Sequence, residues 1–193
     1  MPFLLKFKKV LLHCLRAGNP AEMSISRQFL KSIMTIRILF VCHGNICRSP
    51  MAEFIFKKII SDRGLTDMFE ISSAATSDEE IWNGTGNPIY PPALEQLRLH
   101  NIPCSGHRAV QITERDYDSY DYLVYMDKMN YRNMMQIIPG DPLEKCIRLM
   151  DLTENPGDVS DPWYTDDFEK TFNDLMSGCT ALADYVTRKK QPK

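Results

Sequence analysis

Residues 41–50 read VCHGNICRSP, and they connect the apolar run IRILF (36–40) to the segment MAEFIFKKII (51–60). The run 36–42 is almost continuously apolar, which is typical of a strand that is covered on both faces of its sheet. In residues 49–62 the apolar side chains recur at helical spacing, on the stripe Met51, Phe54, Ile55 and Ile59. The sequence therefore predicts a buried strand and a helix joined by a short polar loop.

The chain beyond this unit alternates the two patterns again. Strands are predicted at 69–74, 120–127 and 146–152, and helices at 91–100 and from Asp166 onward. Such alternation predicts a single α/β domain with a parallel sheet and helices on both faces. Ligands of these sheets bind at the carboxyl ends of the strands, near a topological switch point. Cys42 stands at such an end.

The loop 42–49, CHGNICRS, has residue types suited to holding a phosphate group above a sulfur atom. Backbone N–H groups in such a turn can converge on an anion, and the following helix directs its positive end at the same point. Gly44 is expected to supply the unusual backbone angles of a tight ring, and Asn45 tolerates left-handed geometry. Arg48 offers a planar fork for two phosphate oxygens, and the same positive field favours a thiolate at Cys42.

A less specific interpretation is that Cys42 is a buried core thiol and Arg48 a surface residue, since Cys-x5-Arg is common by chance. The position of the pattern at a strand-to-helix junction, with Gly44, Asn45 and Ser49 inside it, favours the catalytic interpretation.

The segment VCHGNICRSPMAE resembles the signature of the low-molecular-weight protein tyrosine phosphatases, and the later segment DPWYTDDF, 161–168, resembles their second landmark. The likeness covers residues 36 to about 187 and is of the bacterial type. It implies a four-stranded parallel sheet and the hydrolysis of phosphotyrosine monoesters through a phosphocysteine intermediate. By this resemblance Cys42 is the nucleophile, Arg48 stabilises the phosphoryl oxygens, and Asp161 acts as general acid and then as general base.

The resemblance also implies supporting roles around the loop. Ser49 is expected to hydrogen-bond the thiolate, and Asn45 to be held by Ser73 and His107, so that the loop is preformed. In the cleft, aromatic side chains are expected to stack on the substrate; these are Trp82, Trp163 and Tyr164.

Three further loop positions bear on substrate and redox behaviour. His43 replaces a leucine common in animal members and changes the polarity of the cleft floor. Ile46 suits an aromatic ring better than a guanidinium group. Cys47 is expected to form a disulfide with Cys42 after peroxide treatment.

Three other functions share parts of this pattern. A thioredoxin-coupled arsenate reductase shares the fold but needs two further cysteines, and Cys104 has no partner in the forty residues after it. In protein-arginine phosphatases the residue after the loop asparagine is typically Thr, whereas this sequence has Ile46 there. A phosphate-sensing scaffold would usually lack Cys42 or Asp161.

The composition of the chain limits which kinds of partner are expected. The net charge is −2, which does not favour nucleic acid, and no stretch reaches the roughly 20 apolar residues of a membrane span. The cysteines show no zinc spacing, so no metal or cofactor is predicted and the cytoplasm is the simplest compartment. The expected substrate is a phosphotyrosine-containing protein or a small aryl phosphate, with inorganic phosphate as product.

The first 33 residues differ from the rest, with six Lys/Arg and one acidic residue, whereas residues 34–193 hold 17 basic and 24 acidic ones. This leader could be a membrane-surface helix or a degenerate targeting segment, or translation could begin at Met23 or Met34. The phosphatase domain is predicted at 34–190, with 1–33 outside it.

Overall fold

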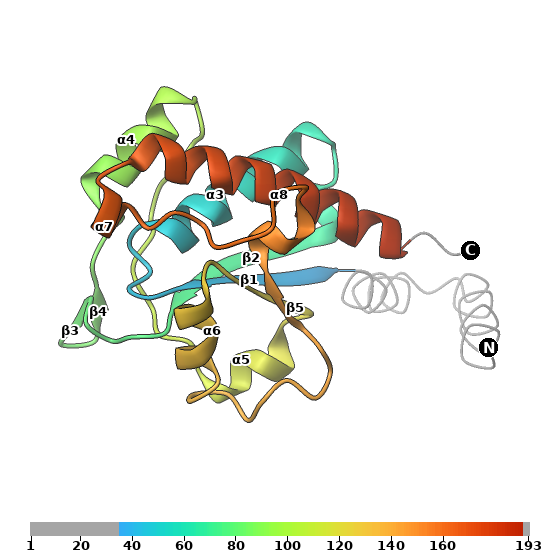
Figure 1. Cartoon of the computed structure of the whole chain (residues 1–193), viewed down its shortest axis with the longest axis horizontal. Coiled ribbons are helices and arrows are strands. Elements are labelled where there is room, and N and C mark those ends of the chain that lie inside the picture. The colour runs from blue at the N-terminus through green and yellow to red at the C-terminus, as the bar shows by residue number, and fades with distance from the viewer. Residues whose placement is uncertain (1–34, 191–193) are drawn as a thin grey trace, which may run out of the picture. The chain divides into compact units, whose positions relative to one another are not determined.

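The computed structural model describes residues 35–190, and the basic leader 1–33 lies outside the described residues (Figure 1). Four strands form a parallel sheet: β1 (Ile36–Cys42), β2 (Phe69–Ala75), β5 (Tyr122–Tyr125) and β6 (Cys146–Arg148). Their order is β2-β1-β5-β6, so β1 is an inner strand with a neighbour on each side. The predicted α/β domain with a four-stranded parallel sheet is confirmed.

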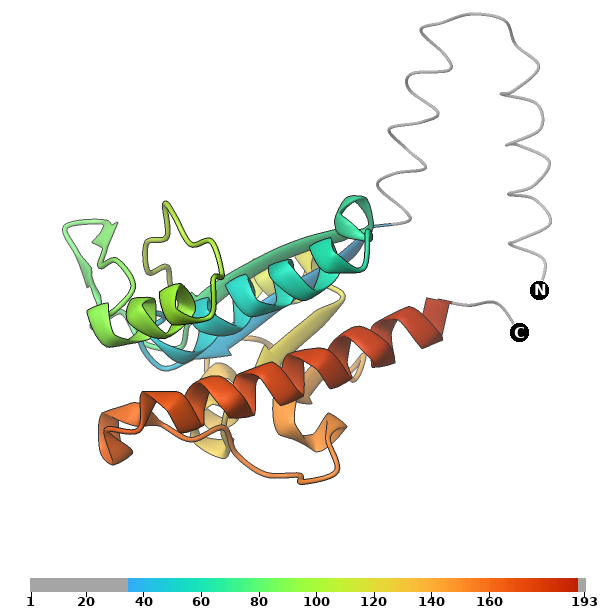
Figure 2. The same ribbon diagram turned by 90° about the horizontal axis from the view of Figure 1, so that it is seen from above.

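Helices cover both faces of this sheet, as Figures 1 and 2 show. One face carries α3 (Arg48–Asp62), α4 (Pro91–Leu99) and the long α8 (Phe168–Lys190), and the other carries α5 (Glu114–Ser119) and α6 (Lys128–Met134). Side chains of β1 alternate between two hydrophobic clusters, with Ile38 and Phe40 in the first and Leu39 and Val41 in the second. β1 is thus buried on both faces, and this fixes the position of the residue at its end.

Several boundaries differ from the prediction. The strand expected at 120–127 is shorter because Asp127 caps the N-terminus of α6, where its side chain accepts a hydrogen bond from the Asn130 backbone N–H. The strand expected at 146–152 ends at Arg148, and the 3₁₀ turn Leu149–Leu152 follows and packs its apolar side chains into the core. The last helix begins at Phe168 instead of Asp166, since Asp166 adopts φ 55° and ends the short helix α7 (Pro162–Thr165).

A two-stranded hairpin after β2 was not predicted. Its strands are β3 (Ile81–Trp82) and β4 (Thr85–Gly86), and its tip is Asn83-Gly84 with φ 49° and 74°. These positive angles suit the tight turn that Asn-Gly pairs favour. At the base of the hairpin, a Cβ atom on Gly86 would lie 1.8 Å from the carbonyl oxygen of Ala109, so only glycine fits there.

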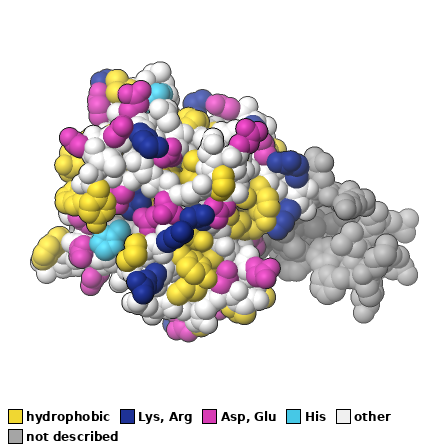
Figure 3. All heavy atoms as spheres, viewed as in Figure 1, with side chains coloured by type: hydrophobic (Ala, Val, Ile, Leu, Met, Phe, Trp, Pro, Cys, Tyr) yellow, Lys and Arg dark blue, Asp and Glu magenta, His cyan; other side chains and the backbone are white. Residues whose placement is uncertain are grey.

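On the face viewed in Figure 3, basic and acidic side chains are interspersed with apolar ones. Among residues 35–190 no helix is long and apolar enough to cross a membrane.

Candidate active site

The loop between β1 and α3 contains one residue with a left-handed backbone. Asn45 adopts the left-handed φ of 55°, as its sequence position predicted. The expectation for Gly44 was wrong, because its φ is not in the positive range. Space is tight at Gly44 instead, since a Cβ atom there would lie 3.0 Å from the Cγ atom of Glu80.

Several carbonyl groups of the loop accept hydrogen bonds from segments distant in sequence. The carbonyl oxygen of Cys42 accepts from the Thr76 N–H at 2.9 Å, and that of His43 accepts from Ser77 at 3.0 Å. Farther along, the Ile46 carbonyl accepts from the Tyr90 N–H at 2.8 Å. These carbonyl groups are therefore engaged by neighbouring segments, an arrangement compatible with loop amide N–H groups that bind an anion.

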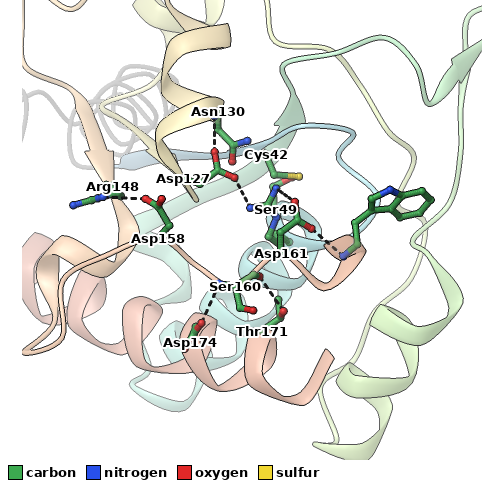
Figure 4. Close-up of polar contacts among 12 residues, drawn as sticks. Cys42, Ser49, Asp127, Asn130, Arg148, Asp158, Ser160, Asp161, Thr171 and Asp174 are labelled. Carbon is green, nitrogen blue, oxygen red and sulfur yellow. Dashed lines mark hydrogen bonds and ion pairs between the residues drawn. The ribbon is translucent and has the colours of Figure 1, made fainter. Parts of the chain in front are cut away.

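A buried polar network holds the loop beneath Cys42. Asn45 is fully buried, and its Nδ2 donates to the Oγ atoms of Ser49 and Ser73, each at 2.9 Å. The Nε2 atom of His107 lies 2.7 Å from the Asn45 carbonyl oxygen. The Oγ atom of Ser49 lies 3.0 Å from the sulfur of Cys42 (Figure 4). Asn45 donates to Ser49, so the Ser49 hydroxyl hydrogen can go to the Cys42 sulfur or to the Ala74 carbonyl oxygen, which is farther away at 3.4 Å.

The Ser73 hydroxyl continues this network away from the cleft. It donates to the Glu53 carboxylate at 2.5 Å, and Glu53 is in turn bonded by Lys57. Glu53 was not among the predicted residues. It lies one turn into α3, so the helix that follows the loop also braces it.

Arg48 lies between two carboxylates. Its side chain is 4% exposed; Nη1 lies 2.5 Å from Asp127 Oδ2, and Nη2 lies 2.6 Å from Asp161 Oδ2. Burial alone lowers the pKa of Arg48, but the charges of Cys42, Asp161 and Asp127 offset this and raise the pKa overall. The guanidinium is therefore permanently charged and aimed by its partners.

The second cysteine of the loop is a protonated thiol. Burial, and next the negative charge of Cys42, raise the pKa of Cys47 far above its usual range, against the opposing effect of Arg48. Cys47 is thus poorly suited to act as a nucleophile at neutral pH.

A cleft of about 830 Å³ opens over the loop. Cys42, Arg48 and Asp161 line it, and so do the predicted residues His43, Gly44, Ile46, Cys47, Trp163 and Tyr164. Trp163 and Tyr164 are 73% and 86% exposed, and Trp163 meets Tyr90 edge-on with ring centroids 6.3 Å apart.

Trp82 does not belong to this lining. It lies in the β3–β4 hairpin and is 70% exposed, so its expected place in the cleft is corrected. His43 lies at the cleft with Nε2 2.9 Å from Glu79 Oε2, which makes that wall polar.

Sequence reasoning missed several lining residues, notably Tyr90, Asp127 and Asn130. Asp127 and Asn130 did leave a signal, because DKMN follows the apolar run of β5 and a helix-capping Asp at a strand end faces the carboxyl edge. Tyr90 left none, since its position depends on the path of the chain after the hairpin.

A thiol and a buried guanidinium on one loop, at the carboxyl edge of a parallel sheet, place the chain in the class of α/β phosphatases that work through cysteine. The family model described as low molecular weight phosphotyrosine protein phosphatase matches residues 37–192. The chain belongs to this family and is a protein tyrosine phosphatase that acts through a phosphocysteine intermediate.

Two named relatives align with this chain over nearly their whole length. The low molecular weight protein-tyrosine-phosphatase YfkJ of Bacillus subtilis is 36% identical, covering 81% of this chain and 99% of its own. The low molecular weight phosphotyrosine protein phosphatase of Sus scrofa is also 36% identical, covering 79% and 97%. The crystal structure of YfkJ superposes with a TM-score of 0.76 at 35% identity, over 81% of this chain and 98% of that one.

Proposed function

We propose that Cys42, Arg48 and Asp161 carry out this hydrolysis in two steps. The observation that supports the proposal best is the contact of Asp161 with Arg48 at 2.6 Å, because it brings a carboxylic acid to the loop that holds the cysteine. In the resting site this carboxylate lies on the arginine that would receive the phosphoryl group. A substrate phosphate would displace it and free it for proton transfer.

In the first step the Cys42 sulfur attacks phosphorus and the bond to the tyrosyl oxygen breaks. Arg48 and the loop amides neutralise the charge on the phosphoryl oxygens, which is the main contribution a protein makes to phosphoryl transfer. Asp161 protonates the departing phenolate, whose conjugate acid has a pKa near 10. The step leaves a phosphocysteine and an ionised Asp161.

In the second step water attacks the phosphocysteine. Asp161 now accepts a proton from the water, and the sulfur leaves as a thiolate. Ser49 stabilises that thiolate through its hydroxyl, 3.0 Å away. Asn45, Ser73 and His107 keep the loop in its strained form, so it does not reorganise during the reaction.

The substrate is a phosphotyrosine-containing protein or a small aryl phosphate, and the product is inorganic phosphate. Trp163 and Tyr164 offer aromatic faces at the mouth of the cleft, where a tyrosyl ring can stack.

We propose the cytoplasm as the compartment, on the evidence of five free cysteines among the described residues. Nucleic acid is not proposed as a partner, since basic side chains are interspersed with acidic ones on the face viewed in Figure 3. The phosphatase domain is proposed to span 34–190.

The test is a panel of phosphotyrosine, phosphoarginine and arsenate assays on the purified protein and on two variants. Cys42→Ser should abolish phosphotyrosine turnover, because an alcohol is a far weaker nucleophile here. Cys104→Ser, a matched change outside the cleft lining, should keep it. Activity that survives Cys42→Ser, or arsenate reduction that depends on Cys104, would overturn the proposal.

A further inference from the structure

One buried side chain of the cleft has no part in the chemistry described so far. Asn130, in α6, is 2% exposed and lines the cleft together with Cys42 and Asp161. Its backbone N–H donates to Asp127 Oδ1 at 2.6 Å, and the other oxygen of that carboxylate holds Arg48. Asn130 is therefore fixed through Asp127 to the arginine that receives the phosphoryl group.

The side-chain Oδ1 atom of Asn130 is buried and has no hydrogen-bond partner among residues 35–190. Buried polar atoms are nearly always paired, and leaving one unpaired costs about 1–3 kcal/mol. Figure 4 shows the Asn130 amide beside Asp127, toward Cys42. An acceptor that is left unpaired beside the reaction centre indicates a ligand that brings a hydrogen-bond donor.

The reaction offers few such donors. A phosphotyrosine dianion presents only acceptor oxygens, and Arg48 and the loop amides already supply their donors. The water of the second step has two O–H groups, and the base Asp161 takes the proton from one of them. The other O–H group matches the free acceptor of Asn130.

We propose that Asn130 is a catalytic residue of the second step, whose Oδ1 accepts a hydrogen bond from the attacking water and turns the water's lone pair toward phosphorus. This inference rests on the two-step mechanism proposed above. A water molecule held by both Asn130 and Asp161 has lost most of its rotational freedom before it attacks, and such positioning lowers the barrier of a bimolecular step.

The step balances with the groups already present. The water oxygen forms a bond to phosphorus while the sulfur–phosphorus bond breaks. The electron pair of the broken bond stays on the Cys42 sulfur, which leaves as a thiolate. One water proton passes to Asp161, which is then ready to act as acid in the next cycle. The second O–H stays on the phosphate product, bonded to Asn130 until release.

Rapid mixing with p-nitrophenyl phosphate can separate the two steps. In Asn130→Ala, kcat should fall about tenfold, the effect of one hydrogen bond, and the burst of p-nitrophenol and the trapped phosphocysteine should increase. kcat/KM should stay within about twofold, since it reports only the steps up to formation of the phosphocysteine. Arg132→Ala, an exposed change on the same helix outside the cleft lining, should leave kcat, kcat/KM, the burst and the trapped phosphocysteine unchanged. Asn130→Ser, which keeps a short acceptor, should recover part of the loss and is the smaller disturbance to folding.

Other outcomes separate the possible failures. If kcat and kcat/KM fall equally in Asn130→Ala, the residue acts on the formation of the phosphocysteine and the proposed role is wrong. If phosphocysteine in Asn130→Ala is hydrolysed at the wild-type rate, the role is also wrong, while the two-step mechanism stands. If no phosphocysteine forms on Cys42 of the wild-type protein, it is the two-step mechanism that fails.

Discussion

Replacing Asp161 by alanine should have opposite effects on turnover and on phosphate binding. Without a general acid, phosphotyrosine turnover should fall by about 10²–10⁴, the usual contribution of acid–base catalysis. p-Nitrophenyl phosphate should lose less, because p-nitrophenolate leaves readily without a proton. The same change removes the carboxylate that lies 2.6 Å from Arg48 Nη2 in the resting site. A phosphate ion would then no longer compete with it.

The gain in phosphate affinity can be sized from the exposure of the pair. Asp161 is 26% exposed, so its ion pair with Arg48 is worth about 1 kcal/mol, near the upper value for accessible pairs. The Ki of inorganic phosphate should therefore fall about fivefold in Asp161→Ala. Steady-state kinetics on both substrates, with phosphate as competitive inhibitor, measure both effects. Equal losses on the two leaving groups, or a raised Ki, would refute the reasoning.

Three further changes test the surroundings. Asn45→Ala should lower the free energy of unfolding by about 2–4 kcal/mol in denaturant titrations, because it removes buried hydrogen bonds and leaves alanine at a positive φ; a change under 1 kcal/mol would contradict this. After peroxide treatment, crosslinking of Cys47 to Cys42 should accelerate as pH rises above 7, because the raised pKa of Cys47 leaves little thiolate at neutral pH. Peptide mapping at pH 7 and 9 measures the rate of crosslinking, and a rate independent of pH would be evidence against this role of the pKa. Trp163→Ala should raise KM for a phosphotyrosine peptide about two- to tenfold, the value of one aromatic contact, whereas Trp82→Ala should leave it unchanged; equal effects would return Trp82 to the cleft.

The strand–loop–helix unit was predictable because its signals are local. The apolar run of β1, the Cys-x5-Arg spacing and the helical stripe after it lie within 27 residues, 36–62. The left-handed Asn45 was predictable from residue type alone. Gly44 was assigned the wrong reason, because its neighbour Glu80 comes from a loop that only the folded chain brings close.

The parts that escaped prediction depend on contacts distant in sequence. That Asp127 holds Arg48 follows from the pairing of β5 with β1, which puts their carboxyl ends side by side. Sequence patterns do not give strand order, so this partner was not found. The resemblance placed Trp82 in the cleft, but the Asn-Gly turn after it folds its segment into a separate hairpin.

That hairpin divides into a part that can vary and a part that cannot. At its tip, Asn83-Gly84, no atom lies within 4 Å of a Cβ built on Gly84, and insertions are best tolerated at open loop tips of this kind. Its base is pressed on the backbone of Ala109, in the segment whose neighbours His107 and Val110 bond to Asn45. Changes at the tip can therefore alter contacts with protein partners, while the fixed base leaves the position of the phosphate loop unchanged.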